Sequence, residues 1–179
     1  MPPAVSLVVP YYGVEDYIDE CLATIRDQTF ADFECVLVDD GSVDGSRAVA
    51  ERYVAADPRF RIVTQPNAGL GAARNTGLAH CSGDYLMFID SDDLLAPRAL
   101  EQLVTTLERT GSDFAGGNVW RLSPTWGLFV SQAHAEQFAE HRERVTIADV
   151  PLLMRDRMIW NKLYRRSFWD AHGYRFPEM

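Results

Sequence analysis

The sequence is short of positive charge and of long apolar runs. It carries 17 Lys and Arg against 26 Asp and Glu, so its formal net charge is −9. A surface of that sign repels phosphate backbones, which argues against nucleic acid as a partner. No stretch of about 18 apolar residues is present, and the N-terminus lacks the basic and apolar regions of a signal peptide. These absences predict neither a membrane span nor secretion.

Cysteine and histidine are also scarce. The three cysteines, Cys21, Cys35 and Cys81, lack the spacing of a metal site. Cys21 falls on the apolar face of a predicted helix and Cys35 inside a predicted buried strand, so we expect small core residues in a reducing compartment. None of the four histidines is assigned a catalytic role. The chain is therefore predicted to be cytoplasmic.

Alternating strand and helix patterns are what the sequence does contain. A continuous apolar run such as VSLVV is typical of a strand buried on both faces, and apolar residues at helical spacing follow it. Strands are predicted at 5–9, 33–38, 61–64, 85–89 and 114–120, and helices at 14–25, 46–56, 70–79 and 100–107, the last ended by Gly111. This order predicts an α/β domain with a Rossmann-like, mainly parallel sheet and helices on both faces.

The pattern weakens after Trp120. Residues 121–150 are predicted to form a helix with loops over the edge of the sheet, and 149–154 a short helix. Residues 161–164 are expected to be extended, and Ser167 to cap a last helix that runs to His172.

Two acidic clusters follow predicted strands. They are Asp39-Asp40-Gly41-Ser42 after the second strand and Asp90-Ser91-Asp92-Asp93 after the fourth. In an open parallel sheet, ligands bind outside the carboxyl ends of the strands, so both clusters should meet at one edge. Clustered carboxylates repel one another unless a cation or a donor-rich ligand lies among them. The alternative for the first cluster is an ordinary strand-to-helix turn.

Four segments of the chain resemble the family 2 glycosyltransferases of the GT-A fold. They are VSLVVPYYGVEDYIDECLATIRDQTF, FECVLVDDGSVDGS, NAGLGAARNTGLAHCSGDYLMFIDSDD and WNKLYRRSFW. They occur in the order of the family and cover nearly the whole chain. The resemblance implies transfer of a sugar from a nucleotide diphosphate to an acceptor. A further and weaker resemblance links NAGLGAARNTG and WNKLYRRSFWDAHG to amino-terminal modules of bacterial proteins that build teichoic-acid or capsular polymers.

Roles for the acidic residues follow from this resemblance and from their chemistry. The Asp40 carboxylate can accept the N3–H of uracil, and Asp39 can serve the base or the ribose. By resemblance, Asp90 contacts the ribose and Asp92 holds a divalent cation, with Asp93 helping. Mn²⁺ and Mg²⁺ both suit such oxygen ligands and leave positions for phosphate.

The third helix begins with a glycine-punctuated turn. Gly71 would let a pyrophosphate approach the backbone and Arg74 would pair with it; a surface arginine is the alternative. A dinucleotide-binding fingerprint is disfavoured, because Arg74 occupies the place of its third glycine and the motif follows the third strand. The other residues predicted to contact the nucleotide sugar are Pro10, Tyr12, Glu15, Asn67 and Ser91.

The resemblance also predicts how the chain is organised. Residues 1–179 would form a single GT-A domain, with a nucleotide-binding half at 1–93 and the start of the acceptor-side half at 94–179. Lys162 or Arg165 could balance phosphate charge near the cleft or be solvated surface cations. The catalytic base, an Asp or Glu in relatives, is expected beyond Met179, so the chain would be truncated at its C-terminus.

The predicted reaction is an inverting, metal-dependent transfer from a UDP-sugar. The acceptor would be a glycan, a polyol-phosphate polymer or a lipid-linked molecule, reached from the inner face of the membrane, and a C-terminal module could follow. The alternatives are a non-catalytic nucleotide-sugar-binding or partner module, and a nucleotidyltransferase. Against the latter, the first strand lacks a following Gly-, Arg- and Lys-rich loop.

Overall fold

A twisted sheet organises the computed structural model, which describes residues 2–123, 125 and 127–178. Its strand order is β3-β2-β1-β4-β8-β5. The strands are β1 (Val5–Tyr11), β2 (Phe33–Asp39), β3 (Phe60–Thr64), β4 (Tyr85–Phe88), β5 (Phe114–Gly116) and β8 (Lys162–Arg165). β1 pairs in parallel with β2 and β4, and β2 with β3, whereas β8 is antiparallel to β4 and β5. The predicted mainly parallel sheet is confirmed.

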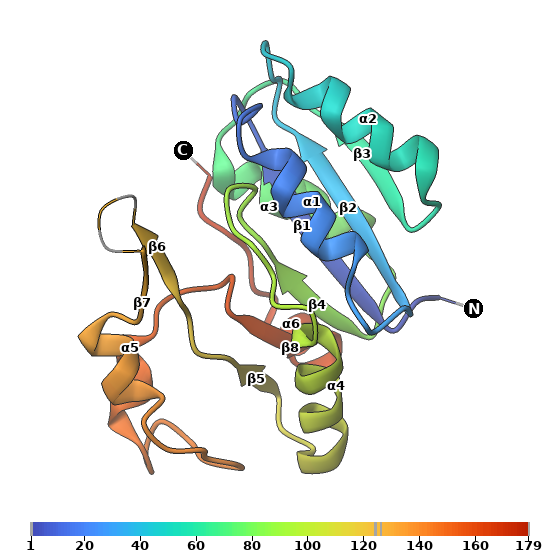
Figure 1. The fold of residues 1–179 in the computed structure, drawn as a ribbon. Coiled ribbons are helices and arrows are strands. Elements are labelled where there is room, and N and C mark those ends of the chain that lie inside the picture. The colour runs from blue at the N-terminus through green and yellow to red at the C-terminus, as the bar shows by residue number, and fades with distance from the viewer. Residues whose placement is uncertain (1, 124, 126, 179) are drawn as a thin grey trace.

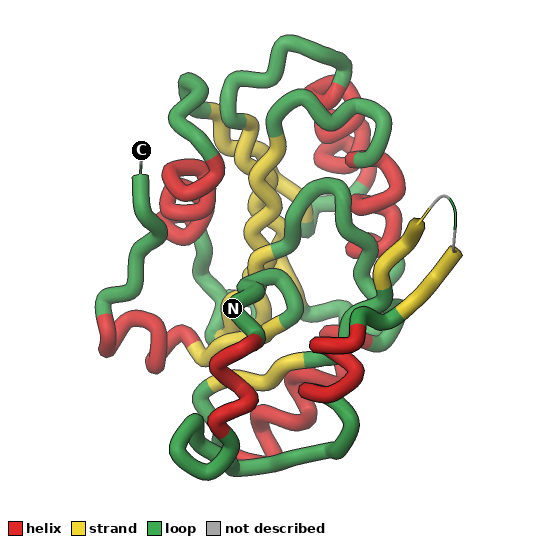
Figure 2. Tube along the Cα trace, turned by 90° about the vertical axis from the view of Figure 1, so that its left-hand side faces the viewer, coloured by secondary structure: helices red, strands yellow, loops and turns green. Residues whose placement is uncertain are grey.

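Helices cover both faces of this sheet, as Figures 1 and 2 show. They are α1 (Ile18–Arg26), α2 (Ser46–Ala56), α3 (Leu70–His80), α4 (Ala99–Thr110) and α6 (Arg166–His172). The core residues of α1, α2 and α4 cluster with Leu7 and Val9 of β1, whereas those of α3 and α6 cluster with Val8. Successive strand residues point to opposite faces, so a continuous apolar strand supplies both cores.

Of the two residues predicted to mark helix ends, Gly111 is confirmed and Ser167 is not. Gly111 follows α4 with a φ of +69°, the left-handed conformation that ends many helices, as expected. The prediction for Ser167 was wrong: α6 begins at Arg166, so Ser167 lies within the helix and Arg165 is the N-cap. The strand predicted at 114–120 ends at Gly116, because its partner β8 begins at Lys162.

The region after Trp120 differs most from its prediction. A helix with loops was expected over 121–150, but the chain forms a hairpin of β6 (Arg121–Ser123) and β7 (Gly127–Phe129), then the short helix α5 (Gln132–Gln137). A 3₁₀ helix, η1 (Pro151–Arg155), replaces the helix expected at 149–154. Leu122 of β6 and Leu128 of β7 are paired across the hairpin, and both side chains are exposed. Because successive residues of a strand point to opposite faces, these two leucines lie on one face of the hairpin.

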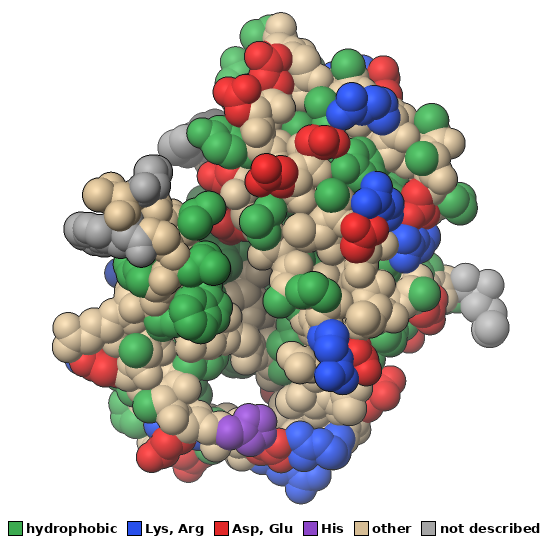
Figure 3. All heavy atoms as spheres, in the orientation of Figure 1, with side chains coloured by type: hydrophobic (Ala, Val, Ile, Leu, Met, Phe, Trp, Pro, Cys, Tyr) green, Lys and Arg blue, Asp and Glu red, His purple; other side chains and the backbone are tan. Residues whose placement is uncertain are grey.

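The hairpin and α5 stand beside the sheet rather than on it (Figure 1). The molecular surface is hollowed between this part and the main body, and apolar side chains gather over the hairpin (Figure 3). All three cysteines are free, and Cys21 and Cys35 are buried as predicted. Within the described residues, no helix combines the length and the apolar character needed to cross a membrane.

Candidate functional site

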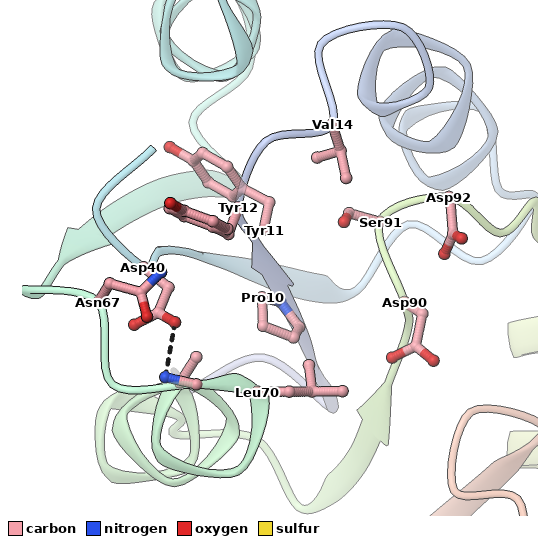
Figure 4. Close-up of a pocket in the computed structure, with 12 residues that line it drawn as sticks. Pro10, Tyr11, Tyr12, Val14, Asp40, Asn67, Leu70, Asp90, Ser91 and Asp92 are labelled. Carbon is pink, nitrogen blue, oxygen red and sulfur yellow. Dashed lines mark hydrogen bonds between the residues drawn. The ribbon is translucent and has the colours of Figure 1, made fainter. Parts of the chain in front are cut away.

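A pocket of about 570 Å³ opens at the carboxyl ends of β1, β2 and β4. That volume lies in the usual range of small-ligand sites. Its lining residues are Pro10, Tyr11, Tyr12, Val14, Asp40, Asn67, Gly69, Leu70, Ala73, Asp90, Ser91 and Asp92. Asp40 and Asn67 lie on one side, and Asp90, Ser91 and Asp92 on the other (Figure 4). The two acidic clusters therefore meet at one edge, as the strand order predicted.

Asp40 is buried at the end of β2 and braces the turn before α3. Its Oδ1 accepts hydrogen bonds from Gln65 Nε2 at 2.7 Å and from the Ala68 amide at 2.9 Å. Its Oδ2 accepts from the Gly69 amide at 2.9 Å, the contact drawn in Figure 4. An ionised carboxylate has about four acceptor positions. Three are used by described residues, so Oδ2 can accept one further hydrogen bond on the pocket side.

The neighbouring Asp39 is used differently. Its Oδ1 accepts from the Ser42 amide at 2.8 Å, and its Oδ2 pairs with Arg47 Nη1 at 3.1 Å. The side chain is 2% exposed and does not line the pocket. Gly41 turns the chain with a φ of +77°, and a Cβ there would meet the Asn67 amide nitrogen at 3.0 Å. The turn interpretation therefore describes Asp39, and its predicted contact with a base or ribose stays a prediction.

The second cluster forms a tight turn in which Asp90 pairs with Arg74, whereas Asp92 and Asp93 form no ion pair with a described residue. The Asp93 amide donates to the Asp90 carbonyl at 3.0 Å and closes the turn. Asp92 is exposed and Asp93 half-buried, and no described residue donates a hydrogen bond to either carboxylate. Burial raises the pKa of Asp93 to about 6, and the charges of Asp92 and Asp90 add to that shift. This end of the pocket thus carries excess negative charge.

The acids suit a divalent cation in type, although they do not form a complete cage. Among the described residues no group of three or more His, Cys, Asp or Glu side chains has the arrangement of a metal site. Mg²⁺ and Mn²⁺ are commonly held by one or two carboxylates together with substrate phosphates. Asp92 and Asp93 fit that pattern.

Arg74 and Gly71 lie behind the pocket instead of lining it. Arg74 Nη2 donates to Asp90 Oδ1, and its side chain is 12% exposed. A Cβ on Gly71 would lie 1.9 Å from the Pro177 carbonyl oxygen, so the space beside this glycine is filled by the chain itself. Their predicted contacts with a pyrophosphate stay predictions.

The remaining predicted residues divide into two groups. Pro10, Tyr12, Asn67 and Ser91 line the pocket, and Tyr12 is 51% exposed, as a ring available for stacking would be. Glu15 does not line it. The Glu15 carboxylate accepts from the Gly45 amide at the start of α2 and so ties the loop after β1 to the loop after β2.

Lys162 and Arg165 were expected to balance phosphate charge near the cleft or to be solvated surface cations, and the structure shows them in packing contacts instead. Lys162 is buried, with Nζ 2.8 Å from Asp156 Oδ2, and Arg165 donates to the Ser112 carbonyl at 2.9 Å. Both therefore support the packing of β8, and neither is a solvated surface cation or part of the pocket lining.

Sequence reasoning missed the apolar floor of the pocket. Leu70 and Ala73 come from the first turns of α3, and Leu70 is 50% exposed. The signal that could have identified it is a leucine directly after the turn glycine Gly69. At the first position of a helix that follows the edge of the sheet, such an apolar side chain has no core to join.

The family model for glycosyl transferase family 2 matches residues 6–173. EpsH of Bacillus subtilis (strain 168), provisionally named a glycosyltransferase, is 37% identical over 185 aligned residues, which cover 98% of this chain and 51% of EpsH. TuaG of the same organism, provisionally named for teichuronic acid biosynthesis, is 37% identical over 110 residues, 60% of this chain and 44% of TuaG.

The fold is shared with a solved enzyme complex. The structure of S. aureus TarS 1-349 in complex with UDP-GlcNAc superposes with a TM-score of 0.82 at 27% identity, over 98% of this chain and 49% of that one. The chain spans about half the length of these relatives. The motifs, the strand order with its edge pocket and the family model agree: this chain belongs to glycosyl transferase family 2 and has the GT-A fold.

Proposed function

We propose that the pocket binds the nucleotide of a UDP-sugar and presents the sugar for transfer to an acceptor. The observation that carries this proposal is the opposition of Asp40 and the acidic pair Asp90 and Asp92 across one pocket. One side offers a single fixed acceptor position, and the other offers the Asp92 carboxylate, which forms no ion pair with a described residue. The similarity to TarS, solved with UDP-GlcNAc, supports this choice of donor.

The uracil ring would lie on the Asp40 side. Its N3–H would donate to the free position on Oδ2, while Tyr12 would stack on the ring. Asp40 is held by three hydrogen bonds, so its acceptor is oriented before a ligand arrives. The ribose would then extend across Pro10 toward Asp90.

Asp92 and Asp93 would hold Mn²⁺ or Mg²⁺ next to the diphosphate. When bound, the cation would stabilise negative charge on the leaving nucleotide diphosphate. The two carboxylates suit this role because no described residue forms an ion pair or a hydrogen bond with either of them, although the charge of Arg121 acts on Asp93 from a distance, and a cation would relieve the repulsion between them.

The reaction we propose is a single displacement that inverts the anomeric centre. The acceptor hydroxyl would attack the anomeric carbon while a carboxylate base takes its proton, and the bond from that carbon to the phosphate oxygen would break, so that UDP leaves with the electron pair. We propose a cell-surface glycan or polymer as the acceptor class; TuaG, named for teichuronic acid biosynthesis, is the relative that supports it. No residue described here is assigned as the base.

Donor binding tests this proposal. Calorimetric titration with UDP, UDP-GlcNAc, CDP and GDP, each with and without Mn²⁺, should give the highest affinity for the uridine compounds and a gain with Mn²⁺. A chain that binds none of the four, although correctly folded by circular dichroism, would contradict the proposed function. Tighter binding of GDP than of UDP would contradict the choice of base.

A further inference from the structure

The last described residues form a strap, 174–178, whose residues Phe176, Pro177 and Glu178 contact α3. Asn75 Nδ2 donates to the Phe176 carbonyl at 2.9 Å, and the Phe176 amide donates to Asn75 Oδ1 at 2.9 Å. One side-chain amide thus satisfies both backbone groups of Phe176, as a neighbouring strand would. Figure 1 shows the C-terminal end beside α3. The strap is therefore fixed to the helix that carries Arg74.

Phe176 fills the space between this helix and the core of the sheet. Its ring centroid lies 4.9 Å from that of Phe88 and 5.8 Å from that of Trp169. The Cζ atom of Arg74 lies 5.3 Å from the same ring, within the range of a cation–π contact. Pro177 packs against Gly71, where no side chain would fit.

Arg74 is consequently held on two sides. Phe176 covers its guanidinium, and Nη2 donates to Asp90 Oδ1. Its Nε is buried and meets no hydrogen-bond partner among the described residues. Asp90 lines the pocket, whereas Arg74 does not. Arg74 is therefore connected to the pocket by its hydrogen bond to the Asp90 carboxylate.

We propose that Arg74 is a positioning residue that acts through Asp90 and does not contact the diphosphate. Held by the strap, it fixes the orientation in which the Asp90 carboxylate meets the ribose of the donor. A direct contact with phosphate would require the side chain to leave this position, because Arg74 does not line the pocket. This inference rests on the proposed binding of a uridine nucleotide.

Uridine and UDP distinguish the two roles, because uridine has the ribose but no phosphate. In metal-free titrations, Arg74→Gln should lower the affinity for both ligands by the same factor, about tenfold, the effect of losing one charge-assisted hydrogen bond. A direct phosphate contact predicts a loss for UDP alone. A larger loss for UDP than for uridine, or no loss for either, would overturn the proposal.

A double substitution supplies an independent readout. If Arg74 acts through Asp90, then Arg74→Gln should cause no further loss of affinity for UDP in an Asp90→Asn background. Additive losses would overturn the proposal. If Arg74→Gln does not fold, Arg74→Lys carries the same comparison of uridine with UDP, because it keeps the charge and removes the planar contact.

The strap is tested by Asn75→Ala, which removes both bonds to Phe176 and should weaken uridine and UDP equally, about threefold. Arg175→Gln is the matched control for Arg74→Gln, since it makes the same chemical change at an exposed side chain of the strap. It should leave both affinities unchanged; a loss equal to that of Arg74→Gln would overturn the proposal. A parent chain that binds neither ligand would instead refute the proposed function.

Discussion

The two acidic clusters at the pocket edge look alike in sequence and differ in how their charges are met. Asp39 and Asp40 are buried, and backbone amides, Gln65 and Arg47 satisfy their oxygens. Asp92 and Asp93 are more exposed and receive no hydrogen bond from a described side chain or amide. The first cluster supports the fold and retains one acceptor, whereas the second keeps its charge available for a cation.

The largest expected effect is on stability at Asp40. Asp40→Ala removes a buried carboxylate that holds the turn before α3 and leaves Gln65 and the amides of Ala68 and Gly69 without that acceptor. We expect a loss of about 3 kcal/mol in the free energy of unfolding, measured by urea denaturation. Asp16→Ala, an exposed carboxylate after β1, is the control and should change stability by less than about 0.5 kcal/mol. Equal losses in the free energy of unfolding for Asp40→Ala and Asp16→Ala would contradict the structural role given to Asp40.

The second cluster should show the reverse behaviour, with an effect on ligand binding. Asp92→Ala should lower the affinity for UDP in the presence of Mn²⁺ by about thirtyfold, or about 2 kcal/mol, because a cation ligand is lost. Affinity without Mn²⁺ and the free energy of unfolding should stay near those of the parent. Unchanged Mn²⁺-dependent binding in calorimetry would show that the cation site lies elsewhere.

The base preference tests the single free acceptor of the first cluster. Cytosine N3 carries no proton, so in CDP it would face Asp40 Oδ2 with a lone pair. We expect UDP to bind about tenfold more tightly than CDP, or by about 1.5 kcal/mol. Equal dissociation constants for the two nucleotides would contradict the proposed contact at Asp40.

The smallest effect concerns Asp93, whose carboxylate is disfavoured in its charged form by burial first and then by repulsion from Asp92 and Asp90. The pKa of Asp93 is raised from 3.8 to about 6, so the folded state favours its protonated form. The stability from this preference is fully present below about pH 4 and is lost as the pH rises through 6. Asp93→Asn should therefore stabilise the metal-free chain by about 1 kcal/mol at pH 7.5, a value reduced for partial exposure.

Urea denaturation of parent and variant at pH 4, 6 and 7.5 measures this difference. The gain from Asp93→Asn should shrink as the pH falls toward 4. A gain of the same size at every pH would point to packing instead of charge repulsion.

Much of the fold was predictable because it depends on local periodicity. Cys21, Leu22 and Ile25 are buried at the spacing that predicts one helix face, and the apolar strand at 5–9 lies at the centre of the sheet. The hairpin at 121–129 was not predictable in the same way. Its strands are three residues long, too short for an alternating pattern to stand out from the surrounding loops.

The candidate site was predicted in its position and less well in its details. Strand order alone brings Asp40 and Asp90 to one edge, and family motifs marked the same residues. Glu15 was assigned to the ligand from its place in a motif, but its carboxylate contacts the Gly45 amide on a different loop. A motif records which residues occur together and leaves open which of their atoms are already bonded.

The sequence by itself determined the alternation of strands and helices, the acidic turns after β2 and β4, and the family. The tertiary structure decided which of those acids are free. Gly69 donates to Asp40 from 29 residues away, Asn75 holds Phe176 from 101 residues away, and Arg74 donates to Asp90 from 16 residues away. A carboxylate is available to a ligand only when the folded chain supplies no donor for it, and those donors come from distant segments that periodicity does not place.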